Sequence, residues 1–432
     1  MTVLDGLYVV AILSALVGLI AVVRGVAGRT GWSAEVQRKI IHVATGLTAL
    51  ALPLVFSGPW PVIVLLSFAV LVMAVLRLPA IAVQGFGAAL HGVDRQSYGE
   101  ILLAIAVGIT FVRAGSEPVL YVLPILILTV SDTAAALTGV RYGRRRFVVE
   151  RGTKSLEGSA MFFVVTLVLA IATLLLMTDL PAGTVAVLSL VVAAFSTLVE
   201  ADSWRGFDNL FVPVGLHLFL ASYMHASLME LVVVMAALGV LIALCMWVGP
   251  RVGLTGHAAR AYAILIFLIL SVTAVHNAIL PLAAVAAHIH ARLSRPCRGA
   301  FPDLDLVAAM TLVALFWLAF GEWHGLSAIN MYNLTFAALA LGLLSTAGLA
   351  GWPHGGLAAV GLGGAVLLVS TVNPDAARWY GSLLPWVGVA LGLSWFAPRW
   401  LGPAFDTARS LRLSGLALST PLALYLSSLV IR

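Results

Sequence analysis

The chain has 432 residues, of which 62% are hydrophobic and only 10% are charged. Soluble domains carry about 25% charged residues, so this composition excludes an ordinary soluble globular protein. The apolar runs are long and continuous and lack the alternating pattern of a membrane β-barrel. We therefore expect an all-α fold, a polytopic bundle of transmembrane helices with about 14 to 16 spans.

Apolar runs bounded by proline, glycine or charged residues predict where the spans lie. In chain order they cover about 7–23, 40–56, 60–76, 98–113, 118–139, 159–179, 183–199, 209–226, 228–248, 261–290, 304–320, 327–349, 357–373, 381–397 and 413–430. The first run has no charged stretch before it and no cleavage site after it, so we expect a retained helix. The run at 261–290 suits neither one span nor two, and we favour two short ones.

Basic residues fall in alternate loops of this arrangement. If the arginine-rich loop 140–154 is cytoplasmic, the chain returns to that side at 24–39, 77–97, 200–208 and 249–260, and each of these loops holds lysine or arginine. The opposite loops of the first half hold neither, except Arg113 at one boundary. The positive-inside rule then places every polar motif of the first half on the cytoplasmic face. We expect an integral protein of a bacterial inner membrane, with its site on that face.

The first polar motif is EVQRKIIH at 35–42, in which Glu35, Arg38, Lys39 and His42 share one helix face. Cations at a cytoplasmic helix end are either topology anchors or phosphate ligands, and both interpretations stay open. The chain has only two lysines, Lys39 and Lys154, and both lie in polar motifs. A coding bias towards arginine explains the rarity of lysine. The alternative is that these two positions need a compact ammonium group.

A second polar motif, DRQSYGE, occupies residues 94–100. We expect Asp94 and Arg95 in a loop. Glu100 begins an apolar helix, where a carboxylate suits the positive helix end, and it is a minor site candidate.

The third motif opens with SDTAAALTGVRYG at 131–143. Asp132, Ala136, Gly139 and Gly143 follow a helical spacing and form one smooth face. Close helix packing through small residues explains Ala136 and Gly139 but not the carboxylate. A carboxylate at a membrane segment requires a metal ion or a cationic partner.

GTKSLEG at 152–158 follows directly. It is no Walker A motif, because the first glycine of that motif is absent. Backbone N–H groups, the hydroxyls of Thr153 and Ser155, and the Lys154 ammonium are nevertheless suited to hold phosphate oxygens. Glu157 lies at the start of the next predicted helix.

The fourth motif is VEADSWRGFDNLFVP at 199–213. It places Glu200, Asp202 and Asp208 close to a single arginine, Arg205, and is followed by Asn209. Mg²⁺ is usually bound by one or two carboxylates together with substrate phosphates. The alternative is a solvated loop with a chance excess of acidic residues.

Together, RKIIH, SDTAAALTGVRYG, GTKSLEGS and the E…DN…VP pattern resemble the phytol kinase/dolichol kinase family, over roughly residues 1–250. Its members phosphorylate lipid alcohols, typically from CTP. The same superfamily includes the CDP-diacylglycerol synthases, which carry a Lys-Arg, Lys-Asp and Pro-Gly-His-Gly-Gly motif where this chain has RGFDNLFVP. They also usually show Ser-Pro before the lysine, where this chain has Gly152 and Thr153. Both differences favour phosphoryl transfer to an alcohol.

The resemblance implies a kinase-like transmembrane domain at 1–250 and leaves 251–432 as a second transmembrane domain of unknown role. It also implies CTP as co-substrate, Mg²⁺ as cofactor, and an isoprenoid alcohol such as phytol, farnesol or a polyprenol as substrate. The expected partners are this alcohol, the nucleotide and membrane lipids, with no nucleic acid. The alternatives are a cytidylyltransferase, a diacylglycerol kinase and a lipid transporter. The inverted repeats and broken helices typical of a transporter are not visible.

On this hypothesis the first, third and fourth motifs contribute residues to one site. The expected catalytic residues are Asp132, Lys154 and Asp208. The expected metal ligands are Asp132, Glu157, Glu200 and Asp208. The residues expected to bind the nucleotide are Arg38, Lys39, His42, Gly139, Gly143, Thr153, Lys154, Ser155 and Asn209.

Overall fold

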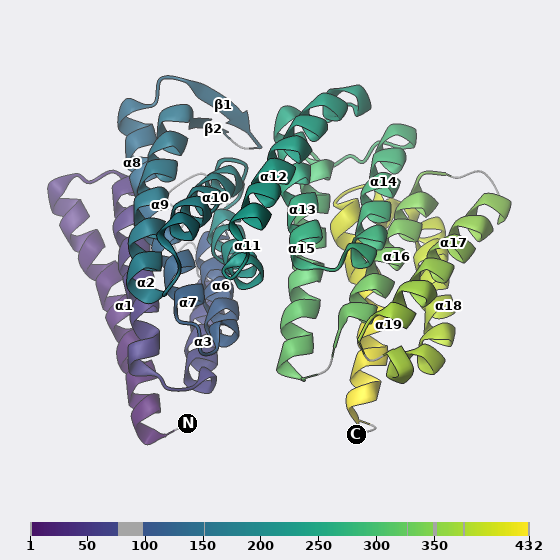
Figure 1. The fold of residues 1–432 in the computed structure, drawn as a ribbon, viewed down its shortest axis with the longest axis horizontal. Helices are drawn as coiled ribbons and strands as arrows, with labels where there is room; N and C mark the ends of the chain where they lie inside the picture. The colour runs from purple at the N-terminus through teal and green to yellow at the C-terminus, as the bar shows by residue number, and fades with distance from the viewer. Residues whose placement is uncertain are drawn as a thin grey trace. The chain divides into compact units, whose positions relative to one another are not determined.

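The computed structural model describes residues 2–76, 98–150, 152–325, 327–348, 352–374 and 376–430. Contacts between residues divide the chain into two compact units, Met1–Ala237 and Leu238–Arg432 (Figure 1). The division falls inside helix α12 (Leu228–Val248). The boundary expected from the sequence, at residue 250, falls just after that helix.

The first unit is a helical bundle with one short β-hairpin. Its elements are α1 (Val3–Thr30), α2 (Ala34–Val55), α3 (Pro59–Leu76), α6 (Gly99–Ala114), α7 (Val119–Leu126), the π-helix η1 (Ile127–Ser131), α8 (Asp132–Tyr142), β1 (Arg146–Val149), β2 (Gly152–Ser155), α9 (Leu156–Met177), α10 (Ala182–Ala201) and α11 (Asp208–Tyr223). The hairpin lies at the end of this unit opposite the N-terminus of α1 (Figure 1).

The expectation of an all-α polytopic bundle is confirmed. Within the described residues, 11 helices are long and apolar enough to cross a membrane, so the chain is an integral membrane protein. The spans expected at 98–113 and 209–226 also form helices, α6 and α11, of 16 residues each. Crossing a bilayer takes about 20 residues, so these two helices are short for a full span.

The polar stretch expected as a plain loop at 140–154 contains the hairpin. Its strands are antiparallel, and Arg146 faces Ser155 across the pair. The sequence Arg-Phe-Val-Val favours a strand, because aromatic and β-branched side chains suit the pleated backbone. Gly152 begins the second strand with φ +111°, a conformation that glycine adopts without strain. The hairpin therefore gives Lys154 a fixed position just before α9.

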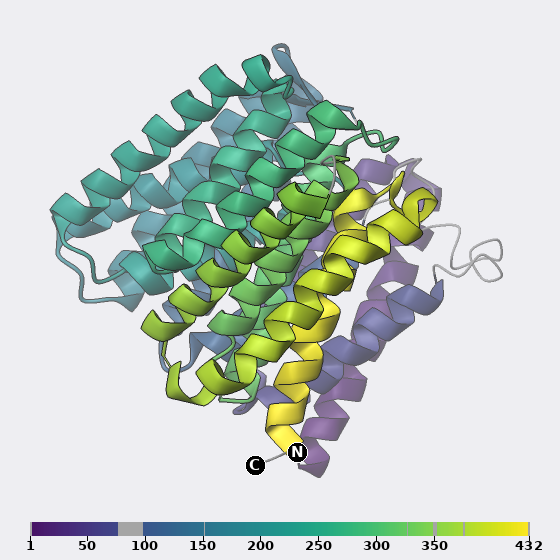
Figure 2. The same ribbon diagram turned by 90° about the vertical axis from the view of Figure 1, so that its right-hand side faces the viewer.

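The second unit is helical throughout its described residues. It contains the end of α12, then η2 (Gly249–Val252), α13 (Gly256–Val272), η3 (Val275–Ala278), α14 (Ile279–Ser294), α15 (Pro302–Trp323), α16 (Ile329–Thr346), α17 (Trp352–Val372), α18 (Ala376–Trp400), η4 (Gly402–Phe405) and α19 (Arg409–Val430). Helices α18 and α19 run side by side (Figure 2). The ambiguous run 261–290 forms two short helices, α13 and α14, as favoured from the sequence.

Helix α16 forms the centre of the second unit. It packs against α14, α17, α18 and α19, and 89% of its 18 residues are buried. Residues 336–344 of this helix are apolar throughout, and a segment that is apolar on every side is suited to such a central place. The ends of α14 and α18 and the start of α19 lie around the C-terminal end of α16. A cavity described below is located there.

Candidate active site in the first unit

A buried ion pair joins the first and third polar motifs. Ser33 caps the start of α2 by accepting a hydrogen bond from the Val36 N–H, 3.3 Å, and Lys39 follows nearly two turns after the cap. The Lys39 ammonium lies 2.6 Å from Asp132 Oδ2 and also donates to the Asp132 carbonyl, 3.4 Å. Lys39 is only 4% exposed. Since a lone buried charge is costly, each of these groups depends on the other.

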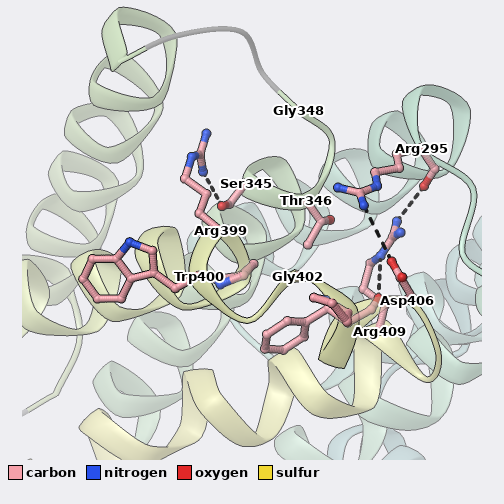
Figure 3. Close-up of a pocket in the computed structure, with 12 residues that line it drawn as sticks. Arg295, Ser345, Thr346, Gly348, Arg399, Trp400, Gly402, Asp406 and Arg409 are labelled. Atoms are coloured by element: carbon pink, nitrogen blue, oxygen red, sulfur yellow. Dashed lines mark hydrogen bonds and ion pairs between the residues drawn. The ribbon is translucent and has the colours of Figure 1, made fainter.

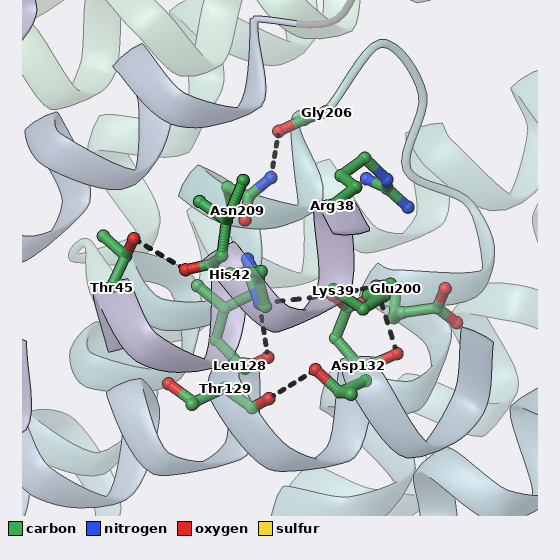
Figure 4. A network of polar contacts seen from close by, with 12 residues as sticks. Arg38, Lys39, His42, Thr45, Leu128, Thr129, Asp132, Glu200, Gly206 and Asn209 are labelled. Atoms are coloured by element: carbon green, nitrogen blue, oxygen red, sulfur yellow. Dashed lines mark hydrogen bonds and ion pairs between the residues drawn. The ribbon is translucent and has the colours of Figure 1, made fainter. Parts of the chain in front are cut away.

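His42 approaches the same carboxylate from the next turn of α2. Its Nε2 lies 3.3 Å from Asp132 Oδ2 and 3.2 Å from the Leu128 carbonyl oxygen. Both neighbours are acceptors, so Nε2 carries a proton in this arrangement. Figure 4 shows Lys39, His42 and Asp132 close together. Asp132 is thus oriented by two donors from one helix.

The backbone just before Asp132 is unusual. Residues Ile127–Ser131 form a π-helix, a wider turn than the α-helix and one often found at functional sites. Ser131 accepts a hydrogen bond from the Thr166 hydroxyl, 2.9 Å, which ties this turn to α9. A side chain at Gly46 of α2 would overlap Thr129. Glycine therefore lets α2 approach the π-turn closely enough for Lys39 to reach Asp132.

A second lysine–carboxylate pair joins the third and fourth motifs. Lys154 Nζ lies 2.6 Å from Glu200 Oε1 and also donates to the Glu200 carbonyl. Burial lowers the pKa of the Lys154 ammonium, but the nearby carboxylates of Glu200 and Asp208 more than offset this effect and hold the pKa above its ordinary value. The carboxylates around Lys154 thus favour its charged form.

The two pairs belong to one electrostatic cluster. The Asp132 carboxylate acts on both Lys154 and Glu200, and Asp208 acts on both as well. Arg38 is within range of Asp132 and Asp208 too. Its guanidinium bonds to Glu35, 2.7 Å away, and its side chain is half exposed. The cluster thus has a buried interior and one cation at its open side.

Asn209 contributes an unsatisfied polar atom next to Asp208. Its side-chain N–H₂ donates to the Gly206 carbonyl, 3.2 Å. Its Oδ1 is buried and accepts no hydrogen bond from the described residues. Such atoms are rare in folded proteins. Figure 4 shows Asn209 beside His42, with its amide group between α2 and the Gly206 loop.

An ion pair that the sequence analysis missed closes the site on the hairpin side. Arg205 lies 2.6 Å from Glu150, whose side chain is almost fully buried. Arg205 has φ +51°, so the α10–α11 turn holds a strained backbone at this non-glycine residue. Gly206 follows with φ +86°, which glycine adopts without strain. Glu150 directly follows β1 and is the only acidic residue among the arginines of this stretch, which was the available signal. The pair fixes the hairpin against the turn that carries Asp208.

The glycines and hydroxyls of the third motif are arranged differently from a phosphate cradle. Ser155 caps α9 by accepting from the Gly158 N–H, 3.1 Å. A side chain at Gly139 or Gly143 would press on Ser155, so both glycines serve close packing of α8 against the cap. Thr153 is exposed on β2. Among the residues of this motif that were expected to bind phosphate, Lys154 is the one that takes part in a lysine–carboxylate ion pair within the described residues.

Glu157 also contacts a different part of the unit. Its carboxylate oxygens accept from the Arg145 N–H, 3.1 and 3.3 Å, at the exposed base of the hairpin.

The second motif lies nearer the site: the Tyr98 N–H donates to the Arg205 carbonyl, 3.0 Å, and Glu100 is in the first turn of α6. Asp94 and Arg95 lie outside the described residues.

The carboxylate oxygens of the site suit a Mg²⁺ ion that is bound together with a nucleotide better than an ion that the protein binds alone. In the described part of the chain no three His, Cys, Asp or Glu side chains are placed to hold a metal ion together. Two of the expected ligands, Asp132 and Glu200, are each paired with a lysine. Mg²⁺ needs only one or two carboxylates when phosphates supply the other ligands, so the carboxylates of this cluster are chemically suited to an ion of that kind.

Comparison with known proteins connects this geometry to a family. The chain is 33% identical over 192 residues to a phytol kinase from Synechocystis sp., an alignment that covers 42% of this chain and 76% of that kinase. The chain belongs to the phytol kinase/dolichol kinase family. No family model matches the chain, and neither does any solved structure. Membership in the phytol kinase/dolichol kinase family confirms the resemblance carried by the four motifs, and more than half of the chain lies outside the alignment.

Proposed function

We propose that the first unit is a membrane-embedded kinase that transfers the terminal phosphoryl group of CTP to an isoprenoid alcohol such as phytol, farnesol or a polyprenol. Family membership supports a lipid-alcohol kinase. The choice of CTP and of an isoprenoid is the finer part of the proposal and follows the family resemblance of the motifs.

The observation that carries the proposal is the convergence of the chain's two lysines. Lys39 and Lys154 come from segments far apart in the sequence, and each lies 2.6 Å from a carboxylate. Phosphoryl transfer relies mainly on positioning and on charge stabilisation, because the protein has little covalent chemistry to perform. A cluster of buried and half-buried cations and carboxylates near the hairpin end of a membrane bundle supplies both.

The lysines act on the phosphates. Lys39, Lys154 and the more exposed Arg38 stabilise negative charge as the bond between the β- and γ-phosphates breaks and CDP leaves. Asn209 Oδ1, which accepts no hydrogen bond from the described residues, is free to accept one from the nucleotide. Mg²⁺, when bound with the nucleotide to Asp132 and Asp208, would neutralise phosphate charge.

A carboxylate takes the proton of the alcohol. The alcohol oxygen attacks the terminal phosphorus, and its proton passes to Asp132, which Lys39 and His42 hold in place. Asp208 is the second candidate for this step. The products are a lipid monophosphate, CDP and one proton. The apolar chain of the substrate lies among the spans, and its hydroxyl reaches the site at the membrane boundary, which we assign to the cytoplasmic side of a bacterial inner membrane by the distribution of basic residues.

A turnover assay tests this function directly. Purified full-length protein in detergent receives Mg²⁺, CTP labelled on the terminal phosphate, and a panel of phytol, farnesol, a polyprenol, diacylglycerol and phosphatidate. We expect the label in an isoprenoid monophosphate, with release of CDP. Label in phosphatidate made from diacylglycerol identifies a diacylglycerol kinase instead. Labelled pyrophosphate formed with phosphatidate identifies a cytidylyltransferase. Parallel reactions with ATP establish which nucleotide is preferred.

A further inference from the structure

The second unit contains a cavity lined by arginines at the end of its central helix. Its volume is about 400 Å³, within the range of small-molecule sites. Its polar lining comes from four segments: the residue after α14, the end of α16, the end of α18 with η4, and the start of α19. Arg295, Arg399 and Arg409 line it together with one carboxylate, Asp406 (Figure 3).

The cavity is poor in negative charge. Asp406 is the only acidic side chain among the described lining residues, and it lies 3.7 Å from Arg295, a loose contact. A helix C-terminus carries about half a negative elementary charge, so the ends of α14, α16 and α18 offset part of the excess. The positive end of α19 acts in the other direction. Three guanidinium groups therefore leave the cavity net positive.

Fixed backbone and side-chain contacts orient the arginines. Arg409 donates to the Arg295 carbonyl, 2.8 Å, and to the Phe405 carbonyl, 3.3 Å, and it is 4% exposed. Arg399 donates to the Ser345 hydroxyl and stacks on Trp395 at 3.5 Å from the ring centre. These contacts use only part of the N–H donors of each guanidinium. The remaining donors are available to an oxyanion.

A buried network next to Arg409 keeps the lining rigid. Ser410 contacts His288 Nδ1, 3.4 Å, and His288 Nε2 lies 3.1 Å from Asp303. Arg292 lies 3.3 Å from the same carboxylate. The network joins the start of α19 to α14 and α15. Binding groups held in this way lose little conformational freedom when a ligand arrives.

We propose that this cavity binds the phosphate group of an anionic lipid through Arg295, Arg399 and Arg409. Guanidinium groups match phosphate because they donate parallel hydrogen bonds to two of its oxygens. Basic pockets between membrane helices are suited to lipid head groups. Trp400 and Leu401 beside the cavity are 79% and 59% exposed, and tryptophan at a helix end is typical of the membrane interface. The lipid tail would lie against these apolar groups.

The test is lipid binding to the purified full-length protein after delipidation. Dioleoyl phosphatidate is titrated and followed by native mass spectrometry, with dioleoylglycerol as the matched lipid that lacks phosphate. We expect saturable binding of phosphatidate alone. Loss of one arginine–phosphate contact is expected to weaken it about tenfold in each of Arg295→Gln, Arg399→Gln and Arg409→Gln.

Arg251 offers a matched control. Like Arg399, it stacks on the tryptophan four residues earlier, at 4.1 Å from the Trp247 ring centre, and donates to that residue's carbonyl. It does not line the cavity. Arg251→Gln should therefore bind phosphatidate as the wild type does. Arg295 is 60% exposed, so Arg295→Gln keeps the test valid even if the buried Arg409 proves necessary for folding.

Competition distinguishes the source of the phosphate. Phosphatidate binding that withstands millimolar inorganic phosphate supports a lipid site. Displacement by inorganic phosphate, with the same dependence on the three arginines, overturns the lipid assignment in favour of a site for free phosphate. Equal affinity for phosphatidate in the wild type and in all three variants overturns the site itself. None of these outcomes depends on the kinase activity of the first unit.

Discussion

The Lys39 ammonium lies 2.6 Å from the Asp132 carboxylate, although the two residues are 93 positions apart in the sequence. Both side chains are largely buried. Moving two charges out of water costs several kcal/mol each, and replacement by apolar residues is often neutral or stabilising. Stability alone therefore explains the pair poorly, and a role in binding charged phosphates explains it better.

Asp132→Asn should reduce turnover by about a hundredfold or more, because it removes both the proton acceptor and a negative charge of the cluster. The measurement is the initial rate of lipid monophosphate formation, with the protein level in the membrane monitored in parallel. Glu230→Gln is the control, since Glu230 only accepts from Ser227 at the exposed start of α12. Asp132→Asn with wild-type rates would remove Asp132 from the mechanism.

A second variant separates the contribution of the Lys39–Asp132 pair to stability from its contribution to catalysis. Asp132→Asn leaves the buried Lys39 without its partner, which is expected to cost about 3–5 kcal/mol. Asp132→Asn combined with Lys39→Met removes both charges and should recover much of the thermal stability. Its activity should stay at the level of Asp132→Asn. Recovery of activity together with stability would mean that the pair serves folding alone.

Lys154→Arg should lower kcat/KM at least about tenfold although the charge is kept. The Lys154 ammonium reaches both the Glu200 side chain and the Glu200 carbonyl, and a planar guanidinium is too large to take the same position. Arg146→Lys, an exposed change on the same hairpin, should have no effect. Equal rates for Lys154→Arg and the wild type would support a coding bias as the reason for the rarity of lysine in this chain.

Much of the site was predictable because each motif carries its own local signal. Lys39 and His42 lie on one face of a helix by spacing alone, and Asp132 is conspicuous as a carboxylate in an apolar run. Alternating basic loops predicted that these motifs share a face. The contacts of Lys39 with Asp132 and of Lys154 with Glu200 then follow from packing, which is a property of the whole bundle.

Other features depend on distances that a sequence does not contain. The hydroxyl of Ser155 was expected to face phosphate, but it caps α9. A helix cap and a phosphate-binding loop both use serine and threonine at such positions, so the sequence alone does not distinguish the two roles. The Glu150–Arg205 pair joins a strand end to a turn in left-handed conformation, and local periodicity does not reveal such a contact. The 16-residue lengths of α6 and α11 likewise depend on where the flanking turns begin.

The Glu150–Arg205 pair should respond asymmetrically to substitution. Arg205→Gln removes the cationic partner of a nearly fully buried carboxylate, so it should lower the free energy of unfolding by about 3–5 kcal/mol. Glu150→Gln leaves Arg205, which is 28% exposed and accessible to water, and should cost about 1 kcal/mol or less. Thermal unfolding in detergent, completed to a double-mutant cycle, measures both values. Equal losses would show that the pair is not buried as described.

Glu157→Gln should change activity by no more than about threefold, because exposed contacts contribute little. Its carboxylate accepts from the Arg145 N–H, and an amide oxygen keeps that bond. Asp208→Asn, in contrast, removes a carboxylate that acts on Lys154 and Glu200 and should lower kcat/KM about a hundredfold. A large loss in Glu157→Gln with intact Asp208→Asn activity would transfer the metal-binding role to Glu157.

Nucleotide binding should depend on Mg²⁺ because Asp132 and Glu200 are already neutralised by lysines, whereas the phosphates bring further negative charge next to them. CTP with Mg²⁺ is therefore expected to raise the unfolding temperature, and CTP with EDTA is expected to raise it much less. Mg²⁺ alone should have little effect, because no three acidic or histidine side chains in the described ranges converge on a metal position. A full stabilising effect of CTP in EDTA would show that the lysines and Arg38 hold the phosphates unaided, and Mg²⁺ would then have no place in nucleotide binding.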